Sequence, residues 1–165
     1  MEQENNSKIS KFVYIASILT FFSIFAPAIL HANDAELFNA LFGSAEQPLS
    51  ENEVVRIATL YDSMYYVSFV IGLIMGPISD KKGNRKTFVV SGSIVYMIFS
   101  FLLRYSPSIS ILLLFRLFQG VGHILTWQSL LVLIYDYTTS TNRAKSLGVY
   151  GIFLGLASGV GTIFG

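Results

Sequence analysis

Three polar side chains interrupt a long apolar run in this 165-residue chain. Arg116, Gln119 and His123 stand at positions i, i+3 and i+7 within the run 109–135, which we expect to be helical, so they share one helical face. Arg116 lies about seven residues into the run, roughly 10 Å along a helix. A charge at that depth in a membrane helix usually faces a bundle interior or an aqueous cavity and marks a transport pathway.

The same residues limit the chemistry that we expect. His123 is able to pass protons near neutral pH, but packing between helices explains a single histidine equally well. The alternative for Arg116 is a snorkelling side chain with two satisfied polar neighbours. We expect no carboxylate beside this set and no second metal ligand, hence no catalytic residue, no metal site and no cofactor; the chain is not expected to be an enzyme. Asp62 either lines an external vestibule or is an exposed aspartate at a helix end.

A second polar stretch, 76–86, separates two strongly apolar segments and packs five charges into the seven residues from Asp80 to Lys86. Its basic residues fix membrane topology and touch anionic lipid in the simpler interpretation. That interpretation leaves Asp80 unexplained. Asp80 follows Gly76 by four residues, where it is placed to meet a helix N-terminus or an arginine, and Gly83 permits a tight reversal. A structural latch between helices is the sharper hypothesis.

Composition places the chain in a membrane. It is 53% hydrophobic and 13% charged, with a mean hydropathy of +0.59, whereas soluble domains carry about 25% charged residues. The net charge of +1 gives no field that would attract nucleic acid. The absence of cysteine removes disulfides, thiolate metal sites and cysteine nucleophiles.

Apolar runs define the elements that position these residues. The sequence predicts an all-α, polytopic membrane helix bundle with about five transmembrane helices. We expect a cytoplasmic N-terminus at 1–11, a transmembrane domain over 12–165, spans at 12–30, 58–78, 87–104, 109–135 and 146–165, an external loop at 31–57, and cytoplasmic loops at 79–86 and 136–145. Within the external segment, 34–42 is expected to form a short amphipathic helix, and Ser50 with Glu53 fits a capping box at the start of the next helix.

Glycines at helical spacing predict two close-packing faces. Gly72 follows Ser68 and precedes Gly76 by four residues each, which places small residues on one face of the second span. The last span carries Gly151, Gly155 and Gly159, a doubled GxxxG ridge that we expect to pack on another helix and not on lipid.

Charge distribution sets the orientation. If the spans alternate, eight basic residues fall on the side of the N-terminus: Lys8, Lys11, Lys81, Lys82, Arg85, Lys86, Arg143 and Lys145. Only Arg56 and Arg104 fall on the other side. Because positive charge stays inside, we expect a cytoplasmic N-terminus in a multi-pass protein of the plasma membrane.

The two polar stretches resemble signatures of the major facilitator superfamily of secondary transporters. The family's loop between the second and third spans carries a Gly-x-Leu-x-Asp-Arg-x-Gly-Arg-Arg-like pattern, which stands here as Gly76, Ile78, Asp80, Lys81, Gly83, Asn84 and Arg85, followed by Lys86. Its fourth span carries Arg-x-x-Gln-Gly-x-Gly, present here without change as Arg116, Gln119, Gly120 and Gly122. The resemblance covers about residues 8–165 and implies part of the N-terminal half of the family's fold.

The resemblance also implies roles. The gate motif, Gly76, Asp80, Lys81, Gly83, Arg85 and Lys86 with the acidic partner Asp136, would latch the cytoplasmic side to the opposite half of the transporter. Arg116, Gln119, Gly120 and His123 would form an intramembrane coupling or substrate face, as in proton-coupled antiporters. Asn84 replaces a usual arginine, and Val160 stands where the family's glycine-rich antiporter motif has a proline.

The predicted number of spans departs from the family. Its members fold as two six-helix halves around a midplane site, and five helices would leave Asp80 without a latch partner and Arg116 facing lipid. We therefore expect the chain to require a C-terminal half or a partner chain, together with lipid, a small solute and protons as the coupling ion. The competing hypothesis is a non-transporting membrane protein that only packs against another membrane chain.

Overall fold

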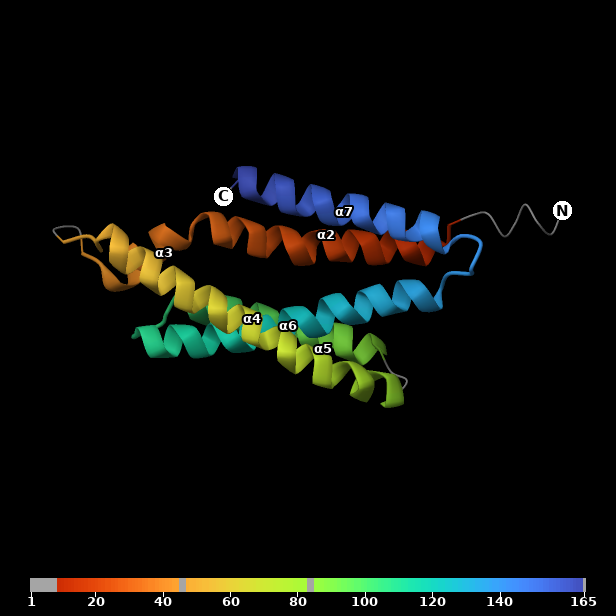
Figure 1. Ribbon diagram of the computed structural model, residues 1–165, viewed down its shortest axis with the longest axis horizontal. Helices are drawn as coiled ribbons and strands as arrows, with labels where there is room; N and C mark the ends of the chain where they lie inside the picture. The colour runs from red at the N-terminus through yellow and green to blue at the C-terminus, as the bar shows by residue number, and fades with distance from the viewer. Residues whose placement is uncertain (1–8, 45–46, 83–84, 165) are drawn as a thin grey trace. The chain divides into compact units, whose positions relative to one another are not determined.

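The computed structural model describes residues 9–44, 47–82 and 85–164, with only the backbone described at residue 73 and at 75–82. These residues form six helices, labelled in Figure 1, and no strand: α2 (Lys11–Ala32), α3 (Asp34–Phe42), α4 (Glu51–Lys82), α5 (Arg85–Leu103), α6 (Ile109–Asp136) and α7 (Arg143–Phe164). Within α2, α4, α5, α6 and α7, five segments are long and apolar enough to cross a membrane. The predicted all-α membrane bundle with about five transmembrane helices is confirmed.

The segment between α2 and α4 contains one short helix. Asp34–Phe42 forms α3 and so confirms the predicted short helix, with Asp34 and Glu36 in its first turn where the helix dipole favours negative charge. The capping box is also present: the Ser50 backbone N–H donates to Glu53 Oε2 at 2.9 Å, and the Glu53 N–H to Ser50 Oγ at 3.4 Å. From that cap, α4 runs without interruption to Lys82.

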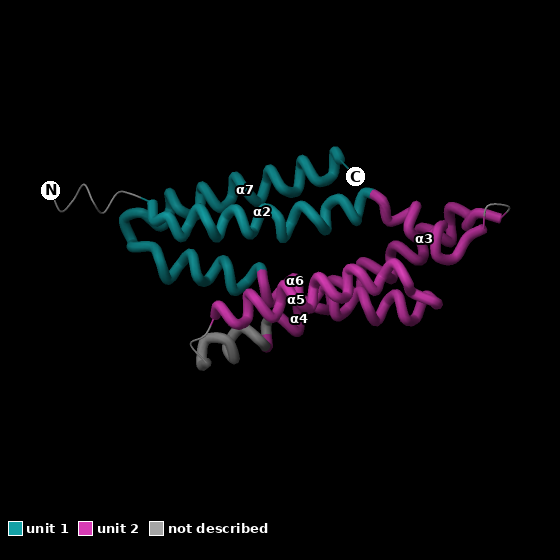
Figure 2. The backbone as a smooth tube through the Cα atoms, turned by 180° about the vertical axis from the view of Figure 1, so that it is seen from behind, with its two compact units in different colours: residues 1–32, 127–165 teal, residues 33–126 magenta. Residues whose placement is uncertain are grey.

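The helices group into two compact units, coloured in Figure 2. Unit 1 contains α2, the end of α6 from Trp127, and α7; unit 2 contains α3, α4, α5 and α6 as far as Thr126. In unit 1, α2 and α7 lie side by side (Figures 1 and 2). The buried α7 residues Ser146, Tyr150, Ala157 and Gly161 form the packing face, and a Cβ on Gly161 would lie 3.0 Å from the Phe25 carbonyl oxygen.

The predicted glycine ridge lies elsewhere on α7. Gly151, Gly155 and Gly159 are exposed, and a Cβ added to any of them would meet nothing within 4 Å among the described residues. The α7–α2 contact therefore does not use them. Their packing role stays a prediction about a helix outside these residues.

Two close helix contacts build unit 2. A Cβ at Gly120 on α6 would lie 2.9 Å from the Ser68 Cβ on α4, and Ser68 and Gly72 are both buried, as expected of a small-residue face. On the other side of α6, a Cβ at Gly122 would lie 2.5 Å from the Tyr96 backbone nitrogen and 2.7 Å from the Gly92 carbonyl oxygen on α5. Glycine therefore lets the α6 backbone approach the α5 backbone at Gly122 and the Ser68 side chain of α4 at Gly120.

Gly122→Val is expected to destabilise the protein by roughly 2–3 kcal/mol, because the added carbons meet backbone atoms that cannot rotate away. The measurement is loss of far-UV circular dichroism during titration of the detergent-solubilised protein with SDS. Gly148→Val is the matched control, since a Cβ there meets nothing within 4 Å among the described residues. Equal midpoints for the two variants would disprove the close α5–α6 contact.

Candidate functional site

Arg116 is enclosed by aromatic and polar side chains of unit 2. It is 1% exposed, and its guanidinium carbon lies 4.0 Å from the ring centre of Tyr61 and 4.7 Å from that of Tyr65. Both tyrosines come from α4, one helical turn apart, so the charge lies over two ring faces. The expectation that Arg116 faces lipid in a five-helix chain is wrong, because α4 covers it.

A carboxylate does lie near this arginine, which corrects the prediction that the polar set has none. Asp62 Oδ1 is 3.7 Å from Arg116 Nη2, and the Asp62 side chain is 40% exposed. This distance exceeds the roughly 2.7–2.9 Å of a charge-assisted hydrogen bond, so Asp62 acts mainly as a nearby counter-charge. Asp62 is therefore part of the Arg116 cluster and is more than an exposed helix-end residue.

Gln119 and His123 extend the cluster along the same face of α6, as the sequence predicts. Arg116 Nη1 donates to Gln119 Oε1 at 2.6 Å, and Gln119 Nε2 donates to the Ser100 hydroxyl of α5 at 2.9 Å. One turn further on, His123 Nδ1 lies 2.5 Å from the Tyr65 hydroxyl. Gln119 and His123 are both buried, so the polar face of α6 is held between α4 and α5.

The small residues explain how helices of this length bring these side chains together. Gly120 lies between Gln119 and His123 on α6, and the Ser68 side chain of α4 packs against it. The Ser68 hydroxyl donates to the Tyr65 carbonyl oxygen at 2.5 Å, which keeps this polar group inside its own helix. The predicted coupling face, Arg116, Gln119, Gly120 and His123, is thus brought together on one helix interface.

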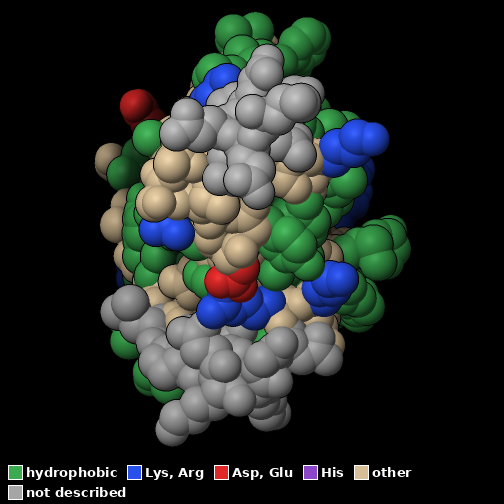
Figure 3. All heavy atoms as spheres, turned by 90° about the vertical axis from the view of Figure 1, so that its right-hand side faces the viewer, with side chains coloured by type: hydrophobic (Ala, Val, Ile, Leu, Met, Phe, Trp, Pro, Cys, Tyr) green, Lys and Arg blue, Asp and Glu red, His purple; other side chains and the backbone are tan. Residues whose placement is uncertain are grey.

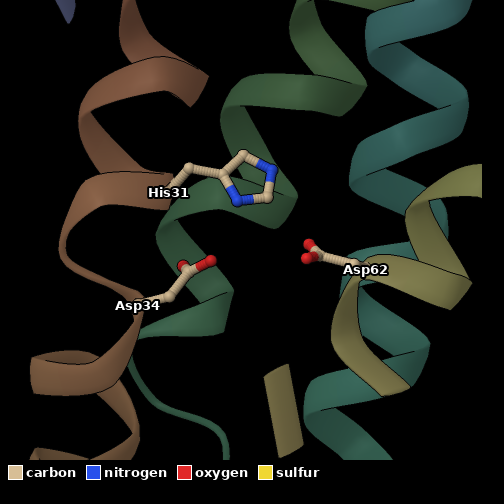
Figure 4. Close-up of side chains that lie close together, drawn as sticks. All are labelled: His31, Asp34 and Asp62. Atoms are coloured by element: carbon tan, nitrogen blue, oxygen red, sulfur yellow. The ribbon is translucent and has the colours of Figure 1, made fainter. Parts of the chain in front are cut away.

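A second acidic residue lies near Asp62. Asp34, in the first turn of α3, points toward Asp62, and oxygen atoms of the two carboxylates lie within 4.8 Å of each other (Figure 4). Asp34 is 9% exposed. Unit 2 therefore brings two carboxylates from the acidic segment and α4 to the same end of the Arg116 cluster.

Most of the predicted gate motif lies outside the described side chains. Gly76, Asp80 and Lys81 fall on the helical backbone of α4, where only the backbone is described, and Gly83 lies outside the described residues altogether. Arg85 and Lys86 begin α5, Arg85 half-buried and Lys86 exposed. Asp136, the last residue of α6, is exposed. The proposed latch pairing is not tested by these positions.

Basic residues begin two helices of unit 1 at the same end. Lys11 starts α2, while Arg143 and Lys145 lie in the first turn of α7, and all three are exposed. Figure 3, which views the end where α2 and α7 begin, shows Lys and Arg side chains on that face. The distribution of basic residues along the sequence predicts that this end faces the cytoplasm.

The two tyrosines that enclose Arg116 are not among the residues predicted from the sequence. Tyr61, Tyr65, Ser68 and Gly72 follow one another at helical spacing and form one stripe of α4. The small residues of that stripe, Ser68 and Gly72, predict a packing face. Extending it toward the start of the helix would have placed Tyr61 and Tyr65 in the same interface.

One known protein family matches most of the chain. The family model described as Major Facilitator Superfamily matches residues 9–165. Multidrug transporter protein MdtP of Bacillus subtilis is 36% identical over 92 residues, which cover 56% of this chain and 17% of that protein. Citrate exporter 1 of Aspergillus niger is 32% identical over 119 residues, covering 70% of this chain and 22% of the exporter.

Riboflavin transporter RibZ of Clostridioides difficile is 25% identical over 122 residues, covering 74% of this chain and 26% of RibZ. The chain thus spans a quarter or less of the length of most of these relatives, and 26% of RibZ. No solved structure gives a significant match.

Proposed function

Since the chain belongs to the major facilitator superfamily, we propose that it works as part of a secondary transporter that moves a small solute across the membrane by alternating access. The observation that carries the proposal is the burial of Arg116, 1% exposed between two tyrosine rings and beside Asp62. An arginine inside a membrane helix is costly. Side chains of α4 and of α6 itself enclose Arg116. This enclosure supports a functional role for Arg116 in transport and disfavours a side chain that only reaches for the membrane surface.

Arg116, Gln119 and His123 form the coupling face in this proposal, with protons as the coupling ion. The Arg116–Gln119 and Gln119–Ser100 hydrogen bonds connect α6 to α5, and the Tyr65–His123 contact connects α6 to α4. A histidine and a carboxylate within one polar cluster supply groups that can exchange protons. The solute site lies where this cluster meets the rest of the transporter.

The gate motif serves the cytoplasmic side in the same proposal. Asp80, Lys81 and Arg85, with Asp136 as acidic partner, latch that side against helices outside this chain. The N-terminus is cytoplasmic, the protein resides in the plasma membrane, and the segment 31–57 is external. The eight-to-two distribution of basic residues supports this orientation.

The relatives suggest the probes for the first experiment. Their names cover drugs, citrate and riboflavin, three chemically different solutes. We expect cells that produce this chain together with the C-terminal half or partner chain that completes the transporter to extrude or accumulate at least one of ethidium, labelled citrate and riboflavin faster than cells with an empty vector. The rate should fall in an Arg116→Lys variant, because a point charge cannot keep the planar stacking of the guanidinium on Tyr61 and Tyr65.

The alternative function, packing against another membrane chain without transport, draws on a separate observation. Gly151, Gly155 and Gly159 form an exposed ridge on α7, where an added Cβ would meet nothing within 4 Å among the described residues. Such a ridge suits close approach of another helix. Flux of none of the three probes, together with loss of a co-purifying membrane chain in Gly155→Leu, would favour this alternative over transport.

A further inference from the structure

One series of ring contacts in unit 2 joins α3 to the Arg116 guanidinium. The Phe38 ring on α3 meets the Tyr61 ring on α4 at a centroid distance of 5.4 Å and an interplanar angle of 76°, an edge-to-face contact. Tyr61 in turn lies 4.0 Å from the guanidinium carbon of Arg116. A side chain on a short helix between two spans thus reaches Arg116 through one intermediate ring.

Phe38 fills a pocket that three further helices share. It is fully buried and packs with Ile57 and Tyr61 of α4, Leu103 of α5 and Leu112 of α6. Leu112 precedes Arg116 on α6 by one helical turn, so the pocket adjoins the arginine directly. Removing the ring from such a pocket leaves a cavity next to Arg116.

Local hydrogen bonds hold α3 in this position. The Asn39 side-chain oxygen accepts the backbone N–H of Leu49 at 2.9 Å, which ties α3 to the chain just before α4. The backbone N–H of Gly43 donates to the Asn39 carbonyl oxygen at 2.9 Å and closes the end of the helix. The placement of Phe38 is therefore fixed by its own connection as well as by the pocket.

From these contacts we propose that Phe38 is a positioning residue for Arg116, acting through Tyr61. In this proposal α3 covers the Arg116 cluster on the side of the membrane where segment 31–57 lies. This inference rests on the proposed transport role of Arg116 and on the external placement of segment 31–57. The buried Phe38 ring holds Tyr61 over the Arg116 guanidinium and keeps water from reaching Leu112. Removal of the Phe38 ring abolishes both effects.

The absence of cysteine from the chain makes a direct test available. Leu112→Cys and Ile124→Cys each place one thiol at a fully buried site on α6, the first beside Phe38 and the second about three turns beyond. A membrane-impermeant maleimide is added to intact cells that produce the protein. Phe38→Ala is expected to raise the labelling rate of the Leu112→Cys reporter roughly tenfold and to leave the Ile124→Cys reporter unchanged, because only the local cover is lost.

Phe42→Ala is the matched control, since it removes the same side chain from the partly buried rim of the same cluster. It should leave both reporters near their original rates. Equal acceleration by Phe38→Ala and Phe42→Ala would overturn the inference. So would acceleration of both reporters by Phe38→Ala, since that result means general loosening of the bundle.

Phe38→Leu gives a second measurement that keeps an apolar side chain in the pocket. For whichever of ethidium, citrate and riboflavin is transported, we expect KM to rise about threefold at an unchanged amount of inserted protein. A purely structural role would instead lower Vmax with the protein amount and leave KM alone, which would contradict positioning. If Phe38→Ala accelerates labelling of the Leu112→Cys reporter while Arg116→Ala transports at the normal rate, Phe38 still covers the cluster. The transport role of Arg116 is then refuted.

Discussion

Arg116→Ala is expected to reduce solute flux by roughly tenfold or more, because it removes the one charge that the tyrosine pair and Gln119 hold within the apolar part of α6. Initial rates in cells producing the variant, divided by the amount of inserted protein, measure the effect. Unchanged kinetics would make Arg116 a structural residue.

A double variant separates lost function from lost stability. Arg116→Ala alone removes the positive charge that lies 3.7 Å from the Asp62 carboxylate, whose side chain is 40% exposed, and leaves that carboxylate less stabilised in the apolar surroundings of α4. Adding Asp62→Asn should therefore recover part of the inserted protein while flux stays low. If the double variant regained flux, the arginine would serve only to neutralise Asp62.

Asp80→Asn is expected to slow transport by roughly tenfold while membrane insertion stays intact, since the loss of one charge at a helix end disturbs a gate far more than a fold. The reason lies in the motif: Asp80 is the acidic residue in a stretch of basic ones, four residues after Gly76. Uptake of the transported probe and the amount of protein in the membrane fraction are measured together.

Lys82→Gln provides the control for Asp80→Asn. Lys82 belongs to the same charged stretch but occupies a variable position of the signature. Its loss should change transport little if the motif acts as a latch, and as much as the loss of Asp80 if the stretch acts only through its charge at the membrane surface. Normal uptake in Asp80→Asn would contradict the proposed latch role of Asp80.

The parts of the fold that depend on one helix at a time were predictable from the sequence. Apolar length gave the transmembrane helices, and the spacing of Ser50 and Glu53 gave the capping box that begins α4. The shared face of Arg116, Gln119 and His123 follows from helical periodicity alone. Each of these features needs no knowledge of a neighbouring helix.

The parts that depend on two helices were not predictable in the same way. Tyr61 and Asp62 meet Arg116 because Ser68 packs on Gly120 and sets the register of α4 against α6. A single sequence contains the small residues but not the identity of their partners, so Asp62 was placed at a vestibule or a helix end. For the same reason, the amphipathic pattern of 34–42 predicted α3 but not the pocket that receives Phe38.

If this chain contributes the Arg116 cluster to a proton-coupled secondary transporter, a pH gradient should drive accumulation of a transported probe. Right-side-out membrane vesicles from cells producing the complete transporter of which this chain is part, with Arg116 or with Arg116→Ala, are given a pH gradient of about one unit, a driving force of roughly 1.4 kcal/mol per proton. We expect gradient-dependent movement of a transported probe that stops when nigericin dissipates the gradient and that is lost in the variant. Movement that is the same with and without Arg116, or indifferent to the gradient, would contradict this role of the Arg116 cluster.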